Sequence, residues 1–213
     1  MNPMLTPESC IYLVWVVWAL SWVIAAVWSS RATNRASFTA ETGYRILTVA
    51  GFLLVFLTGP RPFWGAMAGT HRVHILRLPL DPQFVEPLWQ TPEAVGWAMV
   101  GLAVAGFAFA WWARIHLGAL WSGSITRKAD HRIVDTGPYG LVRHPIYTGL
   151  IAATIAMVVI KASWAAMAGL VIMTAGYWLK AKIEEGFLRQ ELGPEGYDAY
   201  KKRVPMLVPF SPV

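Results

Sequence analysis

Cysteine and charge are both scarce in this chain of 213 residues. The single cysteine, Cys10, excludes an internal disulfide and a zinc site built from cysteines. Charged residues make up 14% of the sequence and hydrophobic residues 56%, a balance that soluble domains rarely show. The apolar excess therefore predicts a single domain, residues 1–213, embedded in a lipid bilayer.

The same composition argues against nucleic-acid binding and against a secretory signal. The net charge is +6, but the basic residues are not gathered into one patch with exposed aromatics, so we expect no nucleic-acid partner. The first apolar run is preceded by Glu8 and by no Lys or Arg, and it is about twice as long as a signal core. We therefore expect this run to be a membrane span.

Long apolar runs predict an all-α, polytopic fold with about five transmembrane helices. A helix needs about 20 apolar residues to cross a hydrocarbon core of ~30 Å. The last run, Ile146–Lys180, is too long for one span, so we expect a helical hairpin with a tight turn at Lys161. The other predicted spans, all within residues 1–113, are Cys10–Ser30, Gly43–Thr58 and Ala94–Ala113.

The distribution of basic residues predicts how these spans are oriented. With the N-terminus outside, 14 of the 18 Lys and Arg residues fall on the cytoplasmic side. The other four are Arg61, Arg72, Arg77 and Lys161. We therefore expect a cytoplasmic C-terminus, and this topology indicates a plasma (inner) membrane.

The segment Pro60–Pro92 is rich in proline and is expected to form an irregular loop outside the membrane. His71 and His74 lie in it at a spacing that suits a metal ion. No third ligand is evident, so we predict no metal site.

Two polar clusters flank the hairpin, one in residues 131–147 and one in Lys180–Gly193. Ionisable groups beside a bilayer are costly, so such groups are candidates for function. Because the hairpin returns the chain to the side from which it came, we expect both clusters at the cytoplasmic face. The alternative for Glu184 and Glu185 is a surface helix in which Lys180 and Lys182 screen the pair.

The first cluster has the features of an anion site at the start of a helix. Pro145 suits the first helical position, which would place Arg143 and His144 at the helix N-terminus. Free N–H groups there attract a carboxylate, and an Arg can hold one with two parallel hydrogen bonds.

Several short motifs follow one another in the second half of the chain. They are, in order, His131-x-Ile-Val134, Gly137-Pro-Tyr139, Arg143-His-Pro-x-Tyr147-x-Gly149, Glu184-Glu185, Gly193 and Tyr197-x-x-Tyr200-Lys-Lys-Arg-Val-Pro205. Together these motifs resemble the isoprenylcysteine carboxyl methyltransferase family of integral-membrane, S-adenosylmethionine-dependent methyltransferases. The resemblance covers Gly118–Phe210, and the first two spans carry no matching motif. Two departures are a turn at Gly193–Gly196 that is one residue longer, and Lys180 where eukaryotic members carry a substrate-contacting Arg.

The resemblance implies a cofactor pocket at the cytoplasmic face, formed by the C-terminal half, residues 114–213. Arg143 and Glu185 would be the catalytic residues, and Lys180 and Arg143 would bind the substrate. The residues that would bind S-adenosylmethionine are His131, Ile133, Val134, Tyr139, His144, Pro145, Tyr147 and Glu184.

The implied reaction is methyl transfer from S-adenosylmethionine to a lipophilic acceptor that enters laterally from the bilayer. The family precedent for the acceptor is the carboxylate of a prenylated cysteine. Alternatives that the sequence leaves open are methylation of a small thiol, a phospholipid amine or a cell-envelope lipid, a membrane reductase that uses a nicotinamide dinucleotide, and a non-catalytic membrane scaffold. Glu185 would act as a base only for an amine or thiol acceptor.

Overall fold

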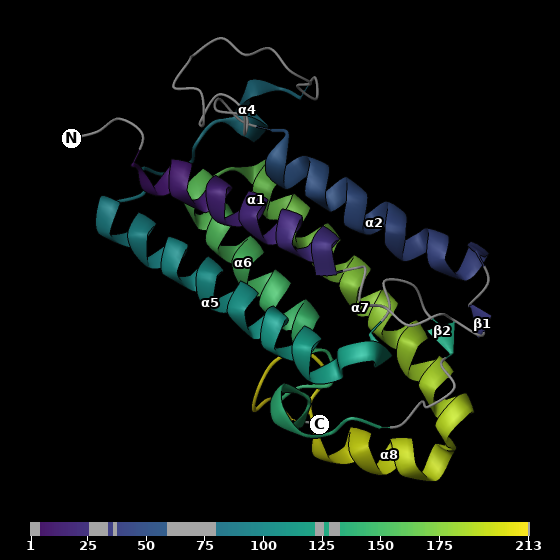
Figure 1. The fold of residues 1–213 in the computed structure, drawn as a ribbon. Coiled ribbons are helices and arrows are strands. Elements are labelled where there is room, and N and C mark those ends of the chain that lie inside the picture. Colours follow the sequence, from purple (N-terminus) through teal and green to yellow (C-terminus); the bar gives the residue numbers. More distant parts are fainter. Residues whose placement is uncertain are drawn as a thin grey trace.

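The protein is almost entirely helical in a computed structural model that describes residues 5–25, 34–35, 38–58, 80–121, 126–127 and 133–212 (Figure 1). The elements, in chain order, are α1 (Pro7–Ala25), β1 (Asn34–Arg35), α2 (Phe38–Phe56), α4 (Pro82–Val85), α5 (Glu93–Leu117), the 3₁₀ turn η2 (Gly118–Leu120), β2 (Thr126–Arg127), the 3₁₀ turn η3 (Gly137–Gly140), α6 (Pro145–Lys161), α7 (Trp164–Leu192) and α8 (Pro194–Arg203). The helical fold is as predicted, and the short strand pair was not.

Each of the five predicted spans contains a long helix. The expected hairpin turn lies at Lys161, where α6 ends, Ala162 adopts a left-handed conformation with φ 53° and the Ser163 side chain caps α7. Helix α7 continues to Leu192, well beyond the predicted end of the fifth span at Lys180. Glu184 and Glu185 therefore belong to the same rigid helix as the hairpin.

Among the described residues, two helices are long and apolar enough to cross a membrane, Pro7–Ala25 and Glu93–Leu120, and Pro145–Lys161 is a shorter apolar helix. Large apolar side chains lie on the outside of the bundle rather than in its core, for example Val17 on α1 and Val49 on α2, with 57% exposure each. Such surfaces suit contact with lipid. Five spans remain the prediction for the chain as a whole.

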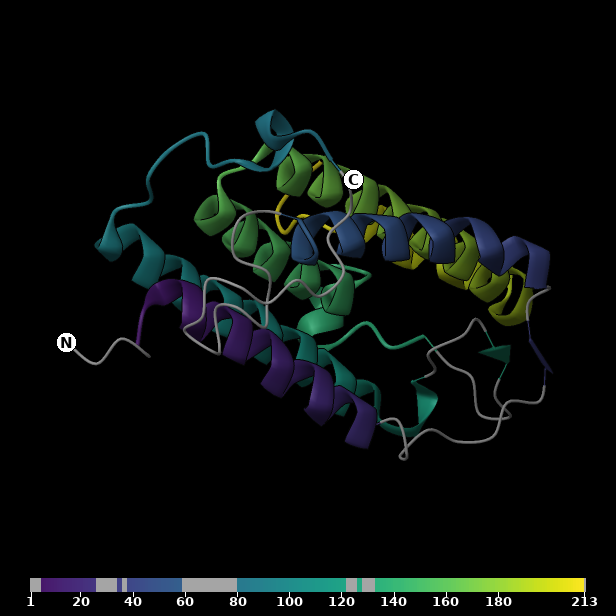
Figure 2. The same cartoon turned by 90° about the horizontal axis from the view of Figure 1, so that it is seen from above.

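The long helices alternate in direction, so the ends of α1, α5 and α7 lie at the same end of the bundle as the starts of α2 and α6 (Figures 1 and 2). At this end β1 pairs with β2 in antiparallel fashion, with Asn34 opposite Arg127 and Arg35 opposite Thr126. The pairing joins the α1–α2 connection to the segment before η3. Arg35 and Arg127 thus share one end of the molecule, in agreement with the side on which the sequence placed both.

Glycines bring two pairs of helices into close contact. A Cβ atom on Gly106 of α5 would lie 2.6 Å from the carbonyl oxygen of Gly149 of α6, so these two backbones touch. On the other side of the bundle α2 packs along α7. Aromatic rings fill the space between α1, α2 and α5, where the Trp15 ring lies 4.8 Å from the rings of both Phe56 and Phe107.

Two basic side chains inside the bundle hold the first two helices to the second half of the chain. Arg114 of α5 donates to the Ala25 carbonyl at the end of α1, at 2.9 Å. Lys161 donates to the Val55 carbonyl at 2.7 Å and to the Thr58 carbonyl, at the end of α2. Cations satisfy the unpaired carbonyls of a helix C-terminus and oppose its dipole. Lys161 is therefore more than the turn residue that the sequence indicated.

Two connecting segments differ from the predictions. The segment Pro60–Pro92 is not irregular throughout, because Pro82–Val85 forms the short helix α4, capped by the Asp81 side chain, which accepts from the Gln83 N–H at 3.0 Å. His71 and His74 lie outside the described residues. The predicted turn Gly193–Gly196 is largely helical, since α8 begins at Pro194.

Candidate functional site

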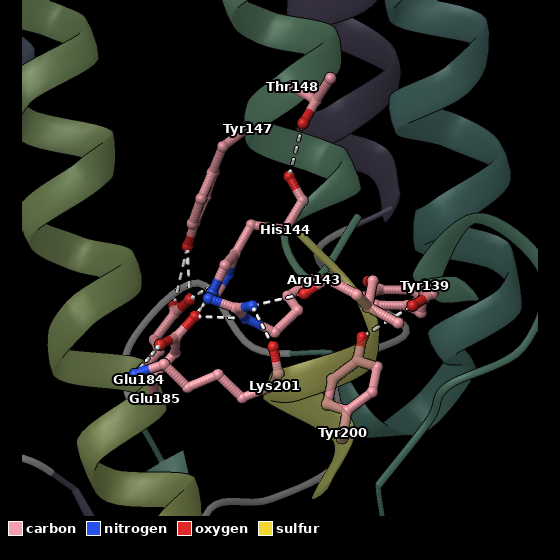
Figure 3. Close-up of polar contacts among 10 residues, drawn as sticks. Tyr139, Arg143, His144, Tyr147, Thr148, Glu184, Glu185, Tyr200 and Lys201 are labelled. Carbon is pink, nitrogen blue, oxygen red and sulfur yellow. Dashed lines mark hydrogen bonds and ion pairs between the residues drawn. The ribbon is translucent and has the colours of Figure 1, made fainter. Parts of the chain in front are cut away.

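The two polar clusters meet at one end of the bundle, where the start of α6, the last third of α7 and the end of α8 converge (Figure 3). This is the end that carries β1 and β2, predicted to be cytoplasmic. The site that follows from this convergence is built around the two neighbouring carboxylates of Glu184 and Glu185.

The start of α6 is fixed by the C-terminal segment of the chain. Pro145 occupies the first helical position, as predicted, and His144 is the N-cap. The backbone N–H groups of Arg143 and His144 donate to the carbonyls of Pro205 at 2.8 Å and Met206 at 3.1 Å. The Thr148 hydroxyl, one turn into the helix, donates to the Leu207 carbonyl at 2.6 Å. The segment after α8 therefore sets where the Arg143 and His144 side chains lie.

Arg143 is buried, with 8% of its surface exposed, and its guanidinium joins three elements. The Nε–H donates to Glu185 Oε1 at 2.8 Å, and Nη1 donates to the carbonyls of Lys201, at 3.1 Å, and Val204. The side chain thus links the start of α6 to α7 and to the end of α8. Removing water from a guanidinium is costly, so these bonds are needed to keep it there.

The imidazole of His144 lies between the two carboxylates. Its Nε2 is 3.2 Å from Glu185 Oε1, and its Nδ1 is 3.6 Å from Glu184 Oε2. Burial lowers the pKa of His144, but the hydrogen bonds and negative charges of Glu184 and Glu185 outweigh burial and raise it above 6.5. The imidazole is therefore biased toward the protonated form that bridges both carboxylates.

Glu184 accepts from one tyrosine and lies beside one lysine. The Tyr147 hydroxyl donates to Oε1 at 2.8 Å and to Oε2 at 2.9 Å, and Lys180 Nζ lies 3.8 Å from Oε1. Burial raises the pKa of Glu184, but the charge of Lys180 and the hydrogen bonds from His144 and Tyr147 lower it to below 4.5. Glu184 is therefore ionised at neutral pH.

Glu185 is held by cations on one oxygen and is open to a further donor on the other. Burial raises its pKa, but the hydrogen bonds and charges of His144 and Arg143 outweigh burial and lower it to about 2. Among the described residues, Oε2 is buried without a hydrogen-bond partner, and the nearest cation is Lys201 Nζ at 3.6 Å. A buried carboxylate oxygen without a donor is costly unless something binds it.

Aromatic rings form one wall of the site. The His144 ring stacks on Tyr147 at 5.5 Å between centroids, and Tyr147 stacks on Tyr177 of α7 at 5.4 Å, with interplanar angles of 7° and 4°. Flat aromatic faces of this kind attract cations and accept other planar groups.

Three further residues predicted to bind the cofactor, Ile133, Val134 and Tyr139, lie in η3 or just before it. Tyr139 is buried, stacks on His116 of α5 at 6.4 Å, and accepts at its carbonyl from the Tyr200 hydroxyl at 2.7 Å. Ile133 packs against a buried cluster formed by Tyr197 and Tyr200 of α8 and by Val204, which follows α8. Val134 is half-buried, and His131 lies outside the described residues.

Some residues of the site were not predicted. Lys201 belongs to a motif of the resemblance but was given no role, although its side chain faces Glu185 and its carbonyl holds Arg143. Tyr177 and Tyr44 also lie beside the predicted residues Tyr147 and Lys180. No motif in the sequence distinguishes either tyrosine from the many aromatics of the spans.

Within the described residues, no group of three or more His, Cys, Asp or Glu side chains is arranged to hold a metal ion. The charges suit an organic ligand instead. The buried carboxylate of Glu185 and the half-buried one of Glu184 lie next to stacked aromatic faces and can hold a cation. The cations Arg143, Lys180 and Lys201 nearby can hold an anion.

Comparison with known proteins bears on the same segment. Residues 99–189 match the model of the isoprenylcysteine carboxyl methyltransferase (ICMT) family. The chain is also similar to protein-S-isoprenylcysteine O-methyltransferase B of Arabidopsis thaliana, with 32% identity over 87 residues. That similarity covers 40% of this chain and 44% of the plant protein, so it spans less than half of either.

The matched segment contains most of α5, all of α6 and most of α7, and with them four of the residues at the centre of the site: Arg143, His144, Glu184 and Glu185. Helices α1, α2 and α8 lie outside it. Over residues 99–189, which make up less than half of the chain, the protein is therefore similar to the isoprenylcysteine carboxyl methyltransferase family.

Proposed function

We propose that the chain is an S-adenosylmethionine-dependent methyltransferase that methylates the carboxylate of a lipophilic, isoprenylcysteine-like acceptor at a membrane. One observation carries the proposal: the neighbouring carboxylates of Glu184 and Glu185, both bridged by His144 and held ionised by nearby cations, lie at the end of an apolar helical bundle. The residues that form this arrangement fall within the segment that matches the methyltransferase family.

The donor groups of the site fit S-adenosylmethionine. Its ammonium group and ribose hydroxyls need acceptors, and Glu184 and the unpaired Oε2 of Glu185 supply them. Its sulfonium is a cation, for which the stacked faces of His144 and Tyr147 are a suitable neighbour. Its carboxylate needs a cation, and Lys201 is the nearest one on the side of α8.

When bound, S-adenosylmethionine would supply an electrophilic methyl group on a cationic sulfur, and the leaving group would be the neutral thioether S-adenosylhomocysteine. The residues of this chain contribute position rather than proton transfer. Arg143 fixes the position of the Glu185 carboxylate, and His144 contacts both carboxylates and holds them at a fixed distance from each other. Alignment of this kind and exclusion of water supply much of the acceleration in such reactions.

The charge state of Glu185 favours a carboxylate acceptor over the alternatives. Because the pKa of Glu185 is lowered to about 2, it is a weak base. A thiol, with a pKa of about 8.5, would need a stronger base to deprotonate it, and so would an ammonium group. An acceptor α-carboxyl, with a pKa of about 3.5, is already ionised at neutral pH and needs none.

The helices support a membrane location. Two of those described are candidate spans, and the exposed apolar side chains of α1 and α2 suit lipid. With five spans and the N-terminus outside, the site would face the cytoplasm at the plasma membrane. The acceptor would then enter between helices from the inner leaflet and the cofactor from the cytoplasm. A preparation free of lipid and detergent that methylated only water-soluble acceptors would argue against this route.

The test is a titration of nanodisc-reconstituted protein with S-adenosylmethionine and, separately, with NADPH. We expect binding of the methyl donor alone. A second assay then follows transfer of a radiolabelled methyl group to S-farnesylcysteine, to a small thiol and to phosphatidylethanolamine, with transfer to the first expected. Binding of NADPH would point to a reductase. Methyl transfer to the thiol or the lipid amine alone would show that the acceptor is not a carboxylate. Failure to bind either cofactor would favour a non-catalytic scaffold.

A further inference from the structure

Helix α2 lies outside the segment that matches the family, yet it packs along α7 beside the site. Figure 2 shows α2 running next to α7 over most of its length. Any residue that α2 contributes to the site would therefore lie outside the matched segment.

Close contacts fix the register of these two antiparallel helices. A Cβ atom on Gly51 would lie 2.7 Å from the carbonyl oxygen of Gly169 and 2.7 Å from the backbone nitrogen of Met173. Two turns of α7 closer to the site, a Cβ atom on Gly176 would lie 2.7 Å from the Thr48 hydroxyl oxygen. One further turn along each helix brings Tyr44 to Lys180. The glycine contacts thus determine which residue of α2 meets the polar end of α7.

At this level the ammonium group of Lys180 lies between two tyrosine rings from different helices. Its Nζ is 5.4 Å from the ring centroid of Tyr44 and 5.5 Å from that of Tyr147. The same Nζ is 3.8 Å from Glu184 Oε1. Tyr44 is therefore a direct neighbour of the predicted substrate-binding lysine.

The Tyr44 side chain has a feature that packing does not explain. Only 5% of Tyr44 is exposed, and its buried hydroxyl makes no hydrogen bond of normal geometry in the described part of the chain, although the Arg45 guanidinium lies close to this side chain. Leaving a buried hydroxyl unpaired destabilises the folded protein, and a phenylalanine would fill nearly the same space without that cost. A polar group in such a place indicates a ligand that satisfies it.

We propose that Tyr44 is a specificity-determining residue for the acceptor, whose hydroxyl donates a hydrogen bond to the acceptor carboxylate beside the Lys180 ammonium. The inference rests on the proposed function and deepens it, because it names the group that recognises the anionic end of the acceptor. A lysine lacks the planar pair of donors by which an arginine holds a carboxylate. A second hydrogen-bond donor, the Tyr44 hydroxyl, would fix the orientation of the acceptor carboxylate, which Lys180 alone does not.

The assignment selects an anionic acceptor over the neutral or cationic ones. A tyrosine O–H next to an ammonium group is a matched pair of donors for a carboxylate. A protonated lipid amine would meet the Lys180 charge and be repelled. The acceptor end of the site would thus lie between α2 and α7, apart from the His144 contacts that hold Glu184 and Glu185.

The experiment measures the affinity of N-acetyl-S-farnesylcysteine for the full chain in nanodiscs, with S-adenosylhomocysteine added to prevent turnover. The variant is Tyr44→Phe, and Tyr12→Phe is the control because Tyr12 is a buried tyrosine of α1 whose ring contacts Phe56, at the opposite end of α2 from Tyr44. The carboxamide of the same ligand serves as an uncharged probe. Thermal unfolding and binding of S-adenosylhomocysteine are measured for each protein.

We expect Tyr44→Phe to bind the carboxylate ligand about 10-fold more weakly, to bind the carboxamide and S-adenosylhomocysteine as the wild type does, and to unfold at the same or a higher temperature. Lys180→Met should reduce affinity for the carboxylate further, and adding Tyr44→Phe to it should then have little effect. Tyr12→Phe should leave all affinities unchanged.

The outcomes separate the two proposals. Equal affinity for the carboxylate in wild type and Tyr44→Phe would overturn the role of Tyr44, even where S-adenosylhomocysteine binds normally. Binding of the carboxylate that depends on Tyr44, without binding of S-adenosylhomocysteine, would support the role of Tyr44 and count against the proposed cofactor. Binding of neither ligand to the wild type would overturn both.

Discussion

Arg143 and Glu185 lie 42 positions apart in the chain and are joined by a buried hydrogen bond of 2.8 Å from Nε to Oε1. Both side chains are about 95% buried, so the pair is shielded from solvent. Nη1 of the same guanidinium donates to the Lys201 and Val204 carbonyls. The planar fork of arginine therefore does two things at once: it orients Glu185 and it attaches the end of α8 to the site.

The first prediction is that Arg143→Lys lowers both stability and activity. A lysine keeps the charge but cannot reach Glu185 and the two carbonyls with one rigid group. We expect a loss of about 1.5–3 kcal/mol in the free energy of unfolding, measured by thermal unfolding in detergent, and loss of most methyl transfer. The control is Arg189→Lys, at an exposed ion pair with Asp198, which should change neither. If Arg143→Lys unfolded at the same temperature as the wild type, the hydrogen bonds from Arg143 to the end of α8 would contribute nothing to stability.

The second prediction concerns the cofactor and Glu184. If this carboxylate binds a charged or hydroxyl group of S-adenosylmethionine, Glu184→Gln should weaken binding by about 1.5–3 kcal/mol in a calorimetric titration. Glu195→Gln, at an exposed position of α8, is the matched control and should bind as the wild type does. Unchanged affinity in Glu184→Gln would remove Glu184 from the cofactor site.

The third prediction is a pH window for the stability that His144 contributes. Burial lowers the pKa of His144 but its two carboxylate partners raise it above 6.5, so the bridge is fully formed below pH 6.5 and is lost as pH rises through the raised value. Burial raises the pKa of Glu185 but His144 and Arg143 lower it from 4.5 to about 2, so its contribution is complete above pH 4.5 and is lost toward pH 2. Both contributions are complete only between these limits.

The measurement is thermal unfolding of wild type and His144→Asn from pH 4 to pH 9. We expect the largest difference in unfolding temperature between about pH 4.5 and 6.5, and a smaller difference at alkaline pH. A difference that stayed constant across the whole range would mean that His144 acts as a neutral packing residue.

The convergence of the two polar clusters was predictable from the sequence because of the hairpin. Lys161 marked the turn, and a helix that returns must bring residues near 144 and 184 to the same end. The position of Pro145 predicted the N-cap at His144 in the same way. Local rules and chain length were sufficient for these features.

Other features depend on packing that a sequence of apolar spans does not display. Both the lipid-facing and the core-facing sides of α2 are apolar, so no periodicity marks the face that meets α7, and Tyr44 could not be assigned to the site. The bonds from Arg143 to the Lys201 and Val204 carbonyls involve backbone atoms, which carry no residue signature. The partners of Lys161 lie more than 100 positions away, at the end of α2.

The fourth prediction tests that attachment of α2. Lys161→Met should leave the Val55 and Thr58 carbonyls without their cation and lower the free energy of unfolding by about 1.5–3 kcal/mol. Lys182→Met is the control, since Lys182 is exposed and its ammonium contacts only the Trp178 face among the contacts described. Equal unfolding temperatures for Lys161→Met and Lys182→Met would show that the contact with α2 contributes nothing.

The fifth prediction compares two glycines at which the same substitution should have opposite effects. In Gly51→Ala the new Cβ would lie 2.7 Å from backbone atoms of α7, which cannot move aside, so α2 must shift at a cost of about 1–3 kcal/mol. In Gly101→Ala the Cβ meets no described atom within 4 Å, and the loss of chain flexibility should stabilise α5 by about 0.5–1 kcal/mol. Thermal unfolding of both variants tests the difference in sign. Because the shift of α2 also moves Tyr44 away from Lys180, Gly51→Ala should weaken acceptor binding and leave S-adenosylhomocysteine binding unchanged. A Gly51→Ala protein as stable as the wild type would rule out the close contact between α2 and α7.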